Sequence, residues 1–460
     1  GASAEPAAAA AGAAAGAAEP AGAVAAAGGA AAGGGAAASG TSGQEAAAPA
    51  AAKNGKLGGA LGGALADLAK LQKQLEEDRQ KMQMFVIRAK QDSEDKQKSM
   101  LQRETRAADY FTGAPGDTCG PEGRFVVEEE LGQGVFSTVY RCQDTETNGH
   151  YAVKFIRSNP MMRRATEKEV KLMCRMTKES VEVDPEGARC LLGLAFFEAF
   201  DHEGHLALVF ELMRCDLRHA LEKYGRGKGL PLLPTIRNFG RNIFCALRVL
   251  KTLGIVHCDI KPENLLLTPD RESVKLSDFG AAMDMRERVR TDYMQPRFYR
   301  APEVILGHSY STQIDIWSAG VTLFELATGR ALFSGETNNE MIHQMLKLLG
   351  PFHKNFSVSG EFSSRHFNKG GDFLNANGDY AVNSTNPASL PREAFQPPDR
   401  PILRILEADL QEAPRGVDAA RHQGLVRHFS DLVEQCLTVN PAQRLTPEVA
   451  LSLRFFAKGA

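Results

Sequence analysis

The 460-residue chain lacks several features that would assign a protein to a class at once. Its formal net charge is only −2, which argues against a protein that coats nucleic acid through a large excess of basic residues. No apolar run reaches the roughly 20 residues of a membrane-spanning helix, and no signal peptide is visible. The eight cysteines include no Cys-x-x-Cys pair, so we interpret them as reduced thiols of a cytosolic or nuclear protein.

Large apolar side chains are almost missing from residues 1–60. This tract consists mainly of Ala, Gly, Pro and Ser, with only five charged residues. Such a composition cannot bury enough apolar surface to offset the entropy of ordering, so we predict that the tract is disordered.

Residues 61–108 have a different composition, dominated by Leu, Gln, Lys, Glu and Arg. Leu68, Leu71 and Leu75 follow the 3–4 spacing of an amphipathic helix. We predict a charged helix here, which either forms a short coiled coil or lies solvated against the following domain. Residues 109–123 contain several Gly and Pro and are predicted to be a linker.

A glycine-rich segment separates two strand-like stretches, residues 125–130 and 138–144. Gly132 and Gly134 allow the backbone to turn tightly and to direct its amides toward a phosphate chain. Because many hairpins contain Gly-x-Gly, this segment alone is weak evidence for a nucleotide site.

Lys154 lies within the apolar strand-like stretch 151–156. Burying an ammonium group is costly unless it pairs with an anion, although a lysine that extends to the surface is the alternative. The stretch 162–178 has helical composition, and Glu169 in it is placed to be the partner of Lys154.

Residues 257–264 bring a carboxylate, an ammonium and an amide together at Asp259, Lys261 and Asn264. These groups can accept a proton from a hydroxyl, screen phosphate charge and hold a metal ion, respectively. A polar surface loop is the alternative. Asp278 follows another short apolar stretch, and two separated carboxylates with an asparagine suit a magnesium–phosphate site better than a glycosidase pair.

Six motifs occur in one order along the chain, and together they resemble the eukaryotic protein kinases. They are Gly-x-Gly-x-x-Ser-x-Val from 132, Tyr-Ala-Val-Lys from 151, His-Cys-Asp-x-Lys-x-x-Asn from 257, Asp-Phe-Gly from 278, Ala-Pro-Glu from 301 and Asp-x-Trp-Ser-x-Gly from 315. The resemblance implies an α+β, bilobal kinase fold over residues 124–460. A small β-rich N-lobe with one helix (124–212) would precede a larger helical C-lobe (213–460), with ATP in the cleft between them.

The resemblance also implies roles for individual residues. Lys154 would hold the α- and β-phosphates and pair with Glu169, and Asp259 would accept the proton of the substrate hydroxyl. Lys261 would steady the γ-phosphate, while Asn264 and Asp278 would hold Mg²⁺. Further residues would surround the nucleotide, in the loop over its phosphates, in the walls around its adenine ring and in the connection between the lobes. They are Leu131, Gly132, Gly134, Ser137, Val139, Ala152, Phe210, Glu211, Met213 and Leu266. For Val139, Ala152 and Leu266, simple core packing is the alternative.

Further features resemble the CMGC group of kinases, and within it the pre-mRNA-splicing Prp-four-type kinases. The resemblance to the CMGC group rests on the segment 294–303 and on an irregular stretch at about 351–424 where that group has its insert. The resemblance to the Prp-four-type kinases rests on the segments 132–139, 156–169, 223–230, 294–307, 334–341, 360–373 and 383–390. This resemblance implies a monomeric serine/threonine kinase of the nucleus that uses ATP and Mg²⁺, acts on spliceosomal proteins, and binds neither membranes nor nucleic acid directly. The alternatives are a Cdc-like or dual-specificity tyrosine-regulated kinase acting on arginine-serine-rich proteins, and a pseudokinase scaffold.

Three details concern regulation and stability. Cys258 replaces the arginine that usually precedes the catalytic aspartate, which removes one basic partner for a phosphate on the activation loop. We therefore expect a phosphate on Tyr293 to be bound by Arg297 and Arg300. Glu303 and Arg444 resemble the buried ion pair that anchors the activation segment in the family.

Overall fold

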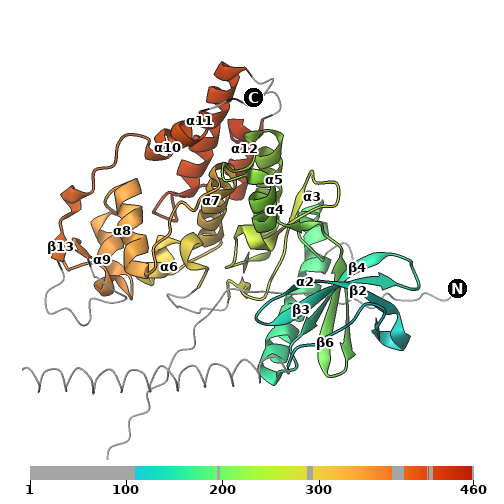
Figure 1. Cartoon of the computed structure of the whole chain (residues 1–460). Helices are drawn as coiled ribbons and strands as arrows, with labels where there is room; N and C mark the ends of the chain where they lie inside the picture. The colour runs from blue at the N-terminus through green and yellow to red at the C-terminus, as the bar shows by residue number, and fades with distance from the viewer. Residues whose placement is uncertain are drawn as a thin grey trace, which may run out of the picture. The chain divides into compact units, whose positions relative to one another are not determined.

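The computed structural model of the chain describes residues 109–193, 197–286, 294–375, 388–411, 413 and 418–457. The disordered tract and the charged helix predicted before residue 109 lie outside this part of the chain, and so does Tyr293. The described residues form a β-rich N-lobe and a helical C-lobe, as predicted (Figure 1).

The N-lobe is built on a six-stranded antiparallel sheet with the order β1-β2-β3-β4-β6-β5. Side chains alternate between the two faces of β4, so Val153 and Phe155 enter the core of the lobe while Lys154 faces the other way. The strands are β1 (Thr118–Cys119), β2 (Phe125–Gln133), β3 (Ser137–Asp144), β4 (His150–Ile156), β5 (Phe197–His202) and β6 (His205–Glu211).

The single long helix of the N-lobe is α2 (Pro160–Val183). It begins where Asn159 accepts a hydrogen bond from the backbone of Met161, at 2.9 Å, and Pro160 occupies the first turn. Its buried positions include Glu169 and Met173, four residues apart on one face. The helix therefore turns Glu169 toward the interior.

The segment 109–123 is not a linker, which corrects the expectation from its Gly and Pro content. Phe111 stacks on Phe155 with 3.9 Å between ring centroids, and Cys119 is fully buried. Thr118 and Cys119 form β1, which pairs with the start of β2. These apolar side chains bind the segment to the sheet, and composition alone hid them among turn-forming residues.

The C-lobe is organised around α7 (Gln313–Thr328), nearly all of whose residues are buried. This helix packs against α5 (Arg237–Leu253) and α11 (Ala419–Cys436), which carry the broad apolar faces that cover it (Figure 1). Besides these helices and the elements of the insert, the C-lobe contains β7 (Cys215–Asp216), α4 (Leu217–Gly225), β8 (Ile255–Val256), β9 (Leu265–Leu267), β10 (Val274–Leu276), β11 (Met283–Asp284), α6 (Pro302–Leu306), α8 (Asn338–Leu349) and α12 (Pro447–Ser452). The short helix α3 (Pro185–Ala188) follows α2.

The stretch predicted as an insert contains regular structure. It includes α9 (Lys354–Ser359), the antiparallel pair β12 (Phe373–Asn375) and β13 (Ala388–Leu390), and α10 (Pro401–Asp409). Because α11 already begins at Ala419, the elements of the insert end before the predicted boundary of about 424.

The predicted ion pair between Glu303 and Arg444 is present and fully enclosed. Both side chains are 0% exposed, and the guanidinium donates to the two carboxylate oxygens at 2.6 and 2.9 Å. Arg444 also donates to the carbonyls of Thr438 and Gln313. The pair thus joins α6 to the segment before α12 in the C-lobe core.

All eight cysteines are free thiols. Among the described helices, none is both long and apolar enough to cross a membrane.

Candidate active site

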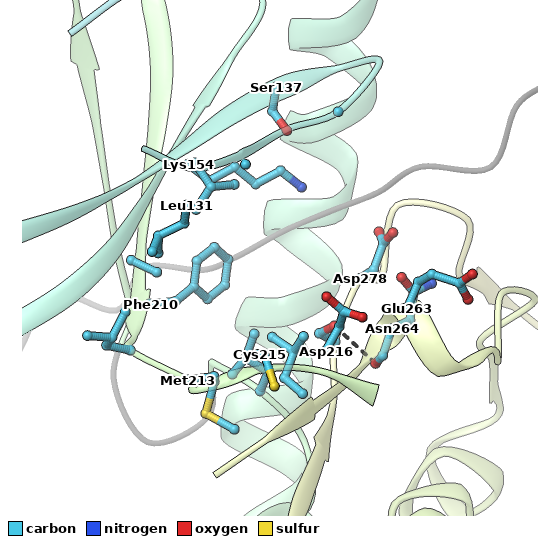
Figure 2. A pocket seen from close by; sticks show the side chains of 18 of the residues that line it. Leu131, Ser137, Lys154, Phe210, Met213, Cys215, Asp216, Glu263, Asn264 and Asp278 are labelled. Atoms are coloured by element: carbon cyan, nitrogen blue, oxygen red, sulfur yellow. Dashed lines mark hydrogen bonds between the residues drawn. The ribbon is translucent and has the colours of Figure 1, made fainter. Parts of the chain in front are cut away.

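A cavity of about 680 Å³ lies where the N-lobe sheet meets the first strands of the C-lobe. Most of the residues predicted for the ATP site line it, and several more from the connection between the lobes join them (Figure 2). The predicted residues that line it are Leu131, Gly132, Gly134, Ser137, Val139, Ala152, Lys154, Phe210, Glu211, Met213, Asn264, Leu266 and Asp278. Glu169, Asp259 and Lys261 are not among the lining residues.

Apolar side chains line one end of the cavity. Ala152 on β4 is the register partner of Phe210 on β6, and Leu266 on β9 also lines the cavity. The carboxylate of Glu211 is bound by Lys275, at 2.6 and 2.7 Å, so this side chain is already engaged outside the cavity. The residues from Glu211 to Met213 can therefore offer backbone groups to the edge of a planar ring.

Buried ionisable side chains gather at the other end of the cavity: Lys154 and Asp278 line it, and Glu169 lies within electrostatic range of both. Lys154, Glu169 and Asp278 are only 4%, 5% and 8% exposed. Lys154 Nζ, Glu169 Oε1 and Asp278 Oδ2 have no hydrogen-bond partner within the described residues. Burial lowers the pKa of Lys154, raises the pKa of Glu169 to about 8 and raises the pKa of Asp278, because each charged form loses its water.

The expected ion pair between Lys154 and Glu169 is therefore not formed, which corrects that prediction. The three groups still influence one another, since Lys154 lowers the pKa values of both Glu169 and Asp278. Leaving a buried charge without a counter-charge costs several kcal/mol. A ligand that brings phosphate oxygens to Lys154 and a cation to Asp278 would relieve this cost, so the residues fit a metal–nucleotide complex. Figure 2 shows Lys154 reaching from the N-lobe sheet toward the side that carries Asp278 and Asn264.

Asp259, Lys261 and Asn264 form a compact hydrogen-bonded group beside this end of the cavity. Lys261 Nζ donates to both carboxylate oxygens of Asp259, at 3.0 and 2.9 Å, and Asn264 Nδ2 donates to Asp259 Oδ2 at 2.7 Å. Burial raises the pKa of Asp259 to about 6, while the charge of Lys261 opposes this shift. The carboxylate is thus fixed in orientation and ionises near neutral pH.

The loop that carries Asp259 is held through its backbone. Asp315, in the first turn of α7, accepts hydrogen bonds from the N–H groups of His257, at 2.7 Å, and Cys258, at 3.0 Å. Cys258 is 1% exposed and has a φ of 66°, an uncommon conformation for a non-glycine residue. His257 donates from Nε2 to the carbonyl of Ser277, and burial lowers the pKa of His257 to about 3. The imidazole is therefore neutral and structural.

The two arginines expected to bind phosphotyrosine differ in accessibility. Arg297 is exposed and donates to the carbonyl of Glu336. Arg300 is buried, and its guanidinium donates to the carbonyl of Gln295 and to Asn338 Oδ1 at 2.6 Å. Arg300 already holds the polypeptide around it, so the exposed Arg297 is the more accessible of the two to an added phosphate, and binding of a phosphate by both arginines stays a prediction.

Sequence reasoning missed several residues at the rim of the cavity. Asp216 accepts a hydrogen bond from the N–H of His219 and so begins α4, and Glu263 forms an ion pair with Arg218 at 3.0 Å. Arg218 also donates to Glu325 at 2.7 Å. Asp216 could have been found, since an aspartate directly before a helical stretch is a typical N-cap.

The fold has two lobes, and the cavity where they meet joins apolar side chains to buried ionisable groups. An oriented carboxylate, that of Asp259, lies beside it. These features together define a protein kinase. Comparison with known sequences agrees: the protein kinase domain profile matches residues 125–456, and the chain belongs to this family.

The relatives place the chain more closely. It is 37% identical over 338 residues to the serine/threonine-protein kinase prp4 of Schizosaccharomyces pombe, a match that covers 73% of this chain and 67% of that protein. It is 33% identical over 333 residues to the serine/threonine-protein kinase prpf4B of Dictyostelium discoideum, covering 72% of this chain and 39% of that protein. A third relative, the serine/threonine-protein kinase ppk15 of Schizosaccharomyces pombe, is 34% identical over 72% of this chain and 61% of its own length. The chain is thus a serine/threonine protein kinase of the CMGC group.

Proposed function

We propose that this kinase is catalytically active and transfers the γ-phosphoryl group of magnesium-bound ATP to nuclear pre-mRNA-splicing proteins. The observation that carries the activity is that Lys154 Nζ and Asp278 Oδ2 are buried at one end of the cavity without hydrogen-bond partners among the described residues, near the oriented carboxylate of Asp259. A pseudokinase scaffold would not need to maintain this costly arrangement.

Each group would have a distinct task. Lys154 would bind the α- and β-phosphates, and Asn264 and Asp278 would hold Mg²⁺. Within the described residues, no group of three or more His, Cys, Asp or Glu side chains could hold a metal alone. This fits Mg²⁺, which proteins bind through one or two carboxylates while the phosphates and water complete its shell. The bound magnesium–ATP complex would supply the transferable phosphoryl group.

Asp259 would act on the substrate. Its carboxylate, held by Lys261 and Asn264, would accept a hydrogen bond from a serine or threonine hydroxyl and take the proton as the oxygen becomes a nucleophile. Lys261 would place a positive charge beside the phosphate oxygens that gain charge during transfer. Glu169, which lies within electrostatic range of Lys154, would form its ion pair only when the ligand is bound.

Purified full-length chain with Mg²⁺ and ATP should phosphorylate a generic basic protein, and Lys154→Met or Asp278→Ala should abolish this activity. Lys369→Met, at an exposed position in the insert, is the matched control and should leave the rate unchanged. Activity that survives either of the first two substitutions would contradict these roles.

The splicing role rests on the resemblance of the sequence to Prp-four-type kinases and on the similarity to prp4 and prpf4B. A panel that compares arginine-serine repeat peptides with proteins of the tri-snRNP particle would test it. Preference for the tri-snRNP proteins is expected, while preference for the repeats would favour the Cdc-like alternative.

We further propose that phosphorylation of Tyr293 orders the activation segment through Arg297, since Cys258 offers no positive charge. Mass spectrometry of active protein should find the phosphate, and Arg297→Gln should lower activity. Active protein without phosphate at Tyr293 would contradict this.

A further inference from the structure

Tyr110, in the segment that precedes the predicted kinase domain, contacts the glycine-rich loop. Its hydroxyl lies 3.0 Å from the carbonyl oxygen of Gly134 and 2.8 Å from that of Val135, and donates its one proton between them. Both carbonyls belong to the turn between β2 and β3, where Gly132, Gly134 and Ser137 line the cavity. The phenol thus holds the loop from outside the cavity.

Tyr110 is itself held in place by neighbouring groups. Arg157 lies 4.9 Å from the centre of the Tyr110 ring, and donates to Asp109 Oδ2 at 2.7 Å and to the carbonyl of Val135 at 3.3 Å. The N–H of Ser158 donates to the carbonyl of Asp109, and Phe111 is stacked in the core of the lobe. The residues on both sides of Tyr110 are therefore anchored to the sheet, so its hydroxyl has a defined position.

Bonds to these two carbonyls fix more than the position of the loop. In a planar trans peptide unit the C=O and N–H groups point in opposite directions. When Tyr110 binds the carbonyls of Gly134 and Val135, the N–H groups of Val135 and Phe136 must therefore point away from Tyr110. Successive backbone N–H groups presented in this way bind phosphate oxygens.

We propose that Tyr110 is a positioning residue for phosphate binding: its hydroxyl sets the orientation of two peptide units in the glycine-rich loop. This inference rests on the proposed function, because it requires ATP to occupy the cavity. It assigns to the segment before the six motifs a contribution to nucleotide affinity that depends on the phosphates and not on the adenine ring.

Tyr110→Phe in the full chain tests this inference, because it removes only the hydroxyl and keeps the ring beside Arg157. The affinities of a non-hydrolysable ATP analogue with Mg²⁺ and of adenosine would be measured by calorimetry, together with the KM for ATP. Loss of one hydrogen-bonding hydroxyl should weaken binding of the ATP analogue about threefold to tenfold and raise the KM for ATP to the same extent, while adenosine affinity stays within about twofold.

The matched control is Tyr224→Phe, at an exposed tyrosine of α4, which should change neither affinity. Equal losses for the ATP analogue and adenosine would show a merely structural role and overturn the inference, as would unchanged binding of the analogue. A wild-type chain that binds no ATP analogue would instead overturn the proposed function on which the inference rests.

Discussion

Replacing Glu303 with Gln should destabilise the C-lobe strongly, since it removes the charge from a fully enclosed ion pair. The substitution keeps the shape of the side chain but leaves the buried guanidinium of Arg444 without a counter-charge. Breaking a buried pair by removing one charge costs about 3–5 kcal/mol. The lower end applies here, because the amide oxygen can still accept one hydrogen bond and three backbone carbonyls continue to bind the guanidinium.

A loss of about 3 kcal/mol corresponds to a decrease in Tm of about 6 °C for a unit of the size of the C-lobe, about 250 residues. The chain offers a local reporter, because its single tryptophan, Trp317, lies with its ring 5.2 Å from the guanidinium of Arg444. Thermal unfolding followed by tryptophan fluorescence therefore reports on the surroundings of the pair. The matched control is Asp409→Asn, which neutralises the carboxylate of a partly exposed pair with Arg330.

Because water screens the pair of Asp409 and Arg330, its loss should cost about 0–1 kcal/mol and shift the Tm by a few degrees at most. The reasoning would be refuted if Glu303→Gln melted within about 2 °C of the wild type, or no lower than Asp409→Asn. Such a result would mean that the carbonyls alone stabilise the guanidinium and that the charge of Glu303 contributes little.

Three further outcomes are expected. Asp259 must be ionised to accept a proton, and its pKa is raised to about 6, so kcat/KM should fall as the pH decreases through about 6. Lys261→Ala removes the charge that lowers the pKa of Asp259 and should therefore move this fall in kcat/KM to higher pH. Arg175 on α2 forms an ion pair with Asp284 on β11 at 2.5 Å, and Arg175→Gln removes it. This substitution should lower kcat/KM about threefold to tenfold in steady-state assays. An unchanged kcat/KM would mean that α2 is positioned without this ion pair. The thiol of Cys258 should resist iodoacetamide in the native protein, since it is buried and its pKa is raised by burial; rapid alkylation seen by peptide mass spectrometry would show that the loop opens.

The sequence allowed the two lobes and most of the cavity to be predicted because those features depend on local patterns. The alternation of apolar residues around Lys154 places it on the cavity side of β4, as the pattern indicates. The helix that carries Glu169 was predicted over 162–178 and extends over Pro160–Val183, because Asn159 and Pro160 begin it earlier. Composition thus predicted the helix, and the position of Glu169 within it predicted the buried face, while capping determined where the helix begins.

Contacts between residues far apart in sequence could not be predicted in the same way. Phe111 and Tyr110 are ordinary residues of a Gly- and Pro-containing stretch until the sheet brings Phe155 and the glycine-rich loop beside them. The separation of Lys154 and Glu169 likewise depends on the exact position of α2 relative to β4, which helical periodicity does not determine.

The way in which Asp315 holds the loop before Asp259 has a consequence for how this kinase can diverge from its relatives. Asp315 binds the N–H groups of His257 and Cys258, and every amino acid except proline supplies such a group. The side chain at 258 can therefore change over evolutionary time without displacing Asp259, provided that the new residue tolerates the left-handed backbone and the enclosed space. A change of side chain at 258 can thus alter what this loop binds while the backbone that positions Asp259 stays in place.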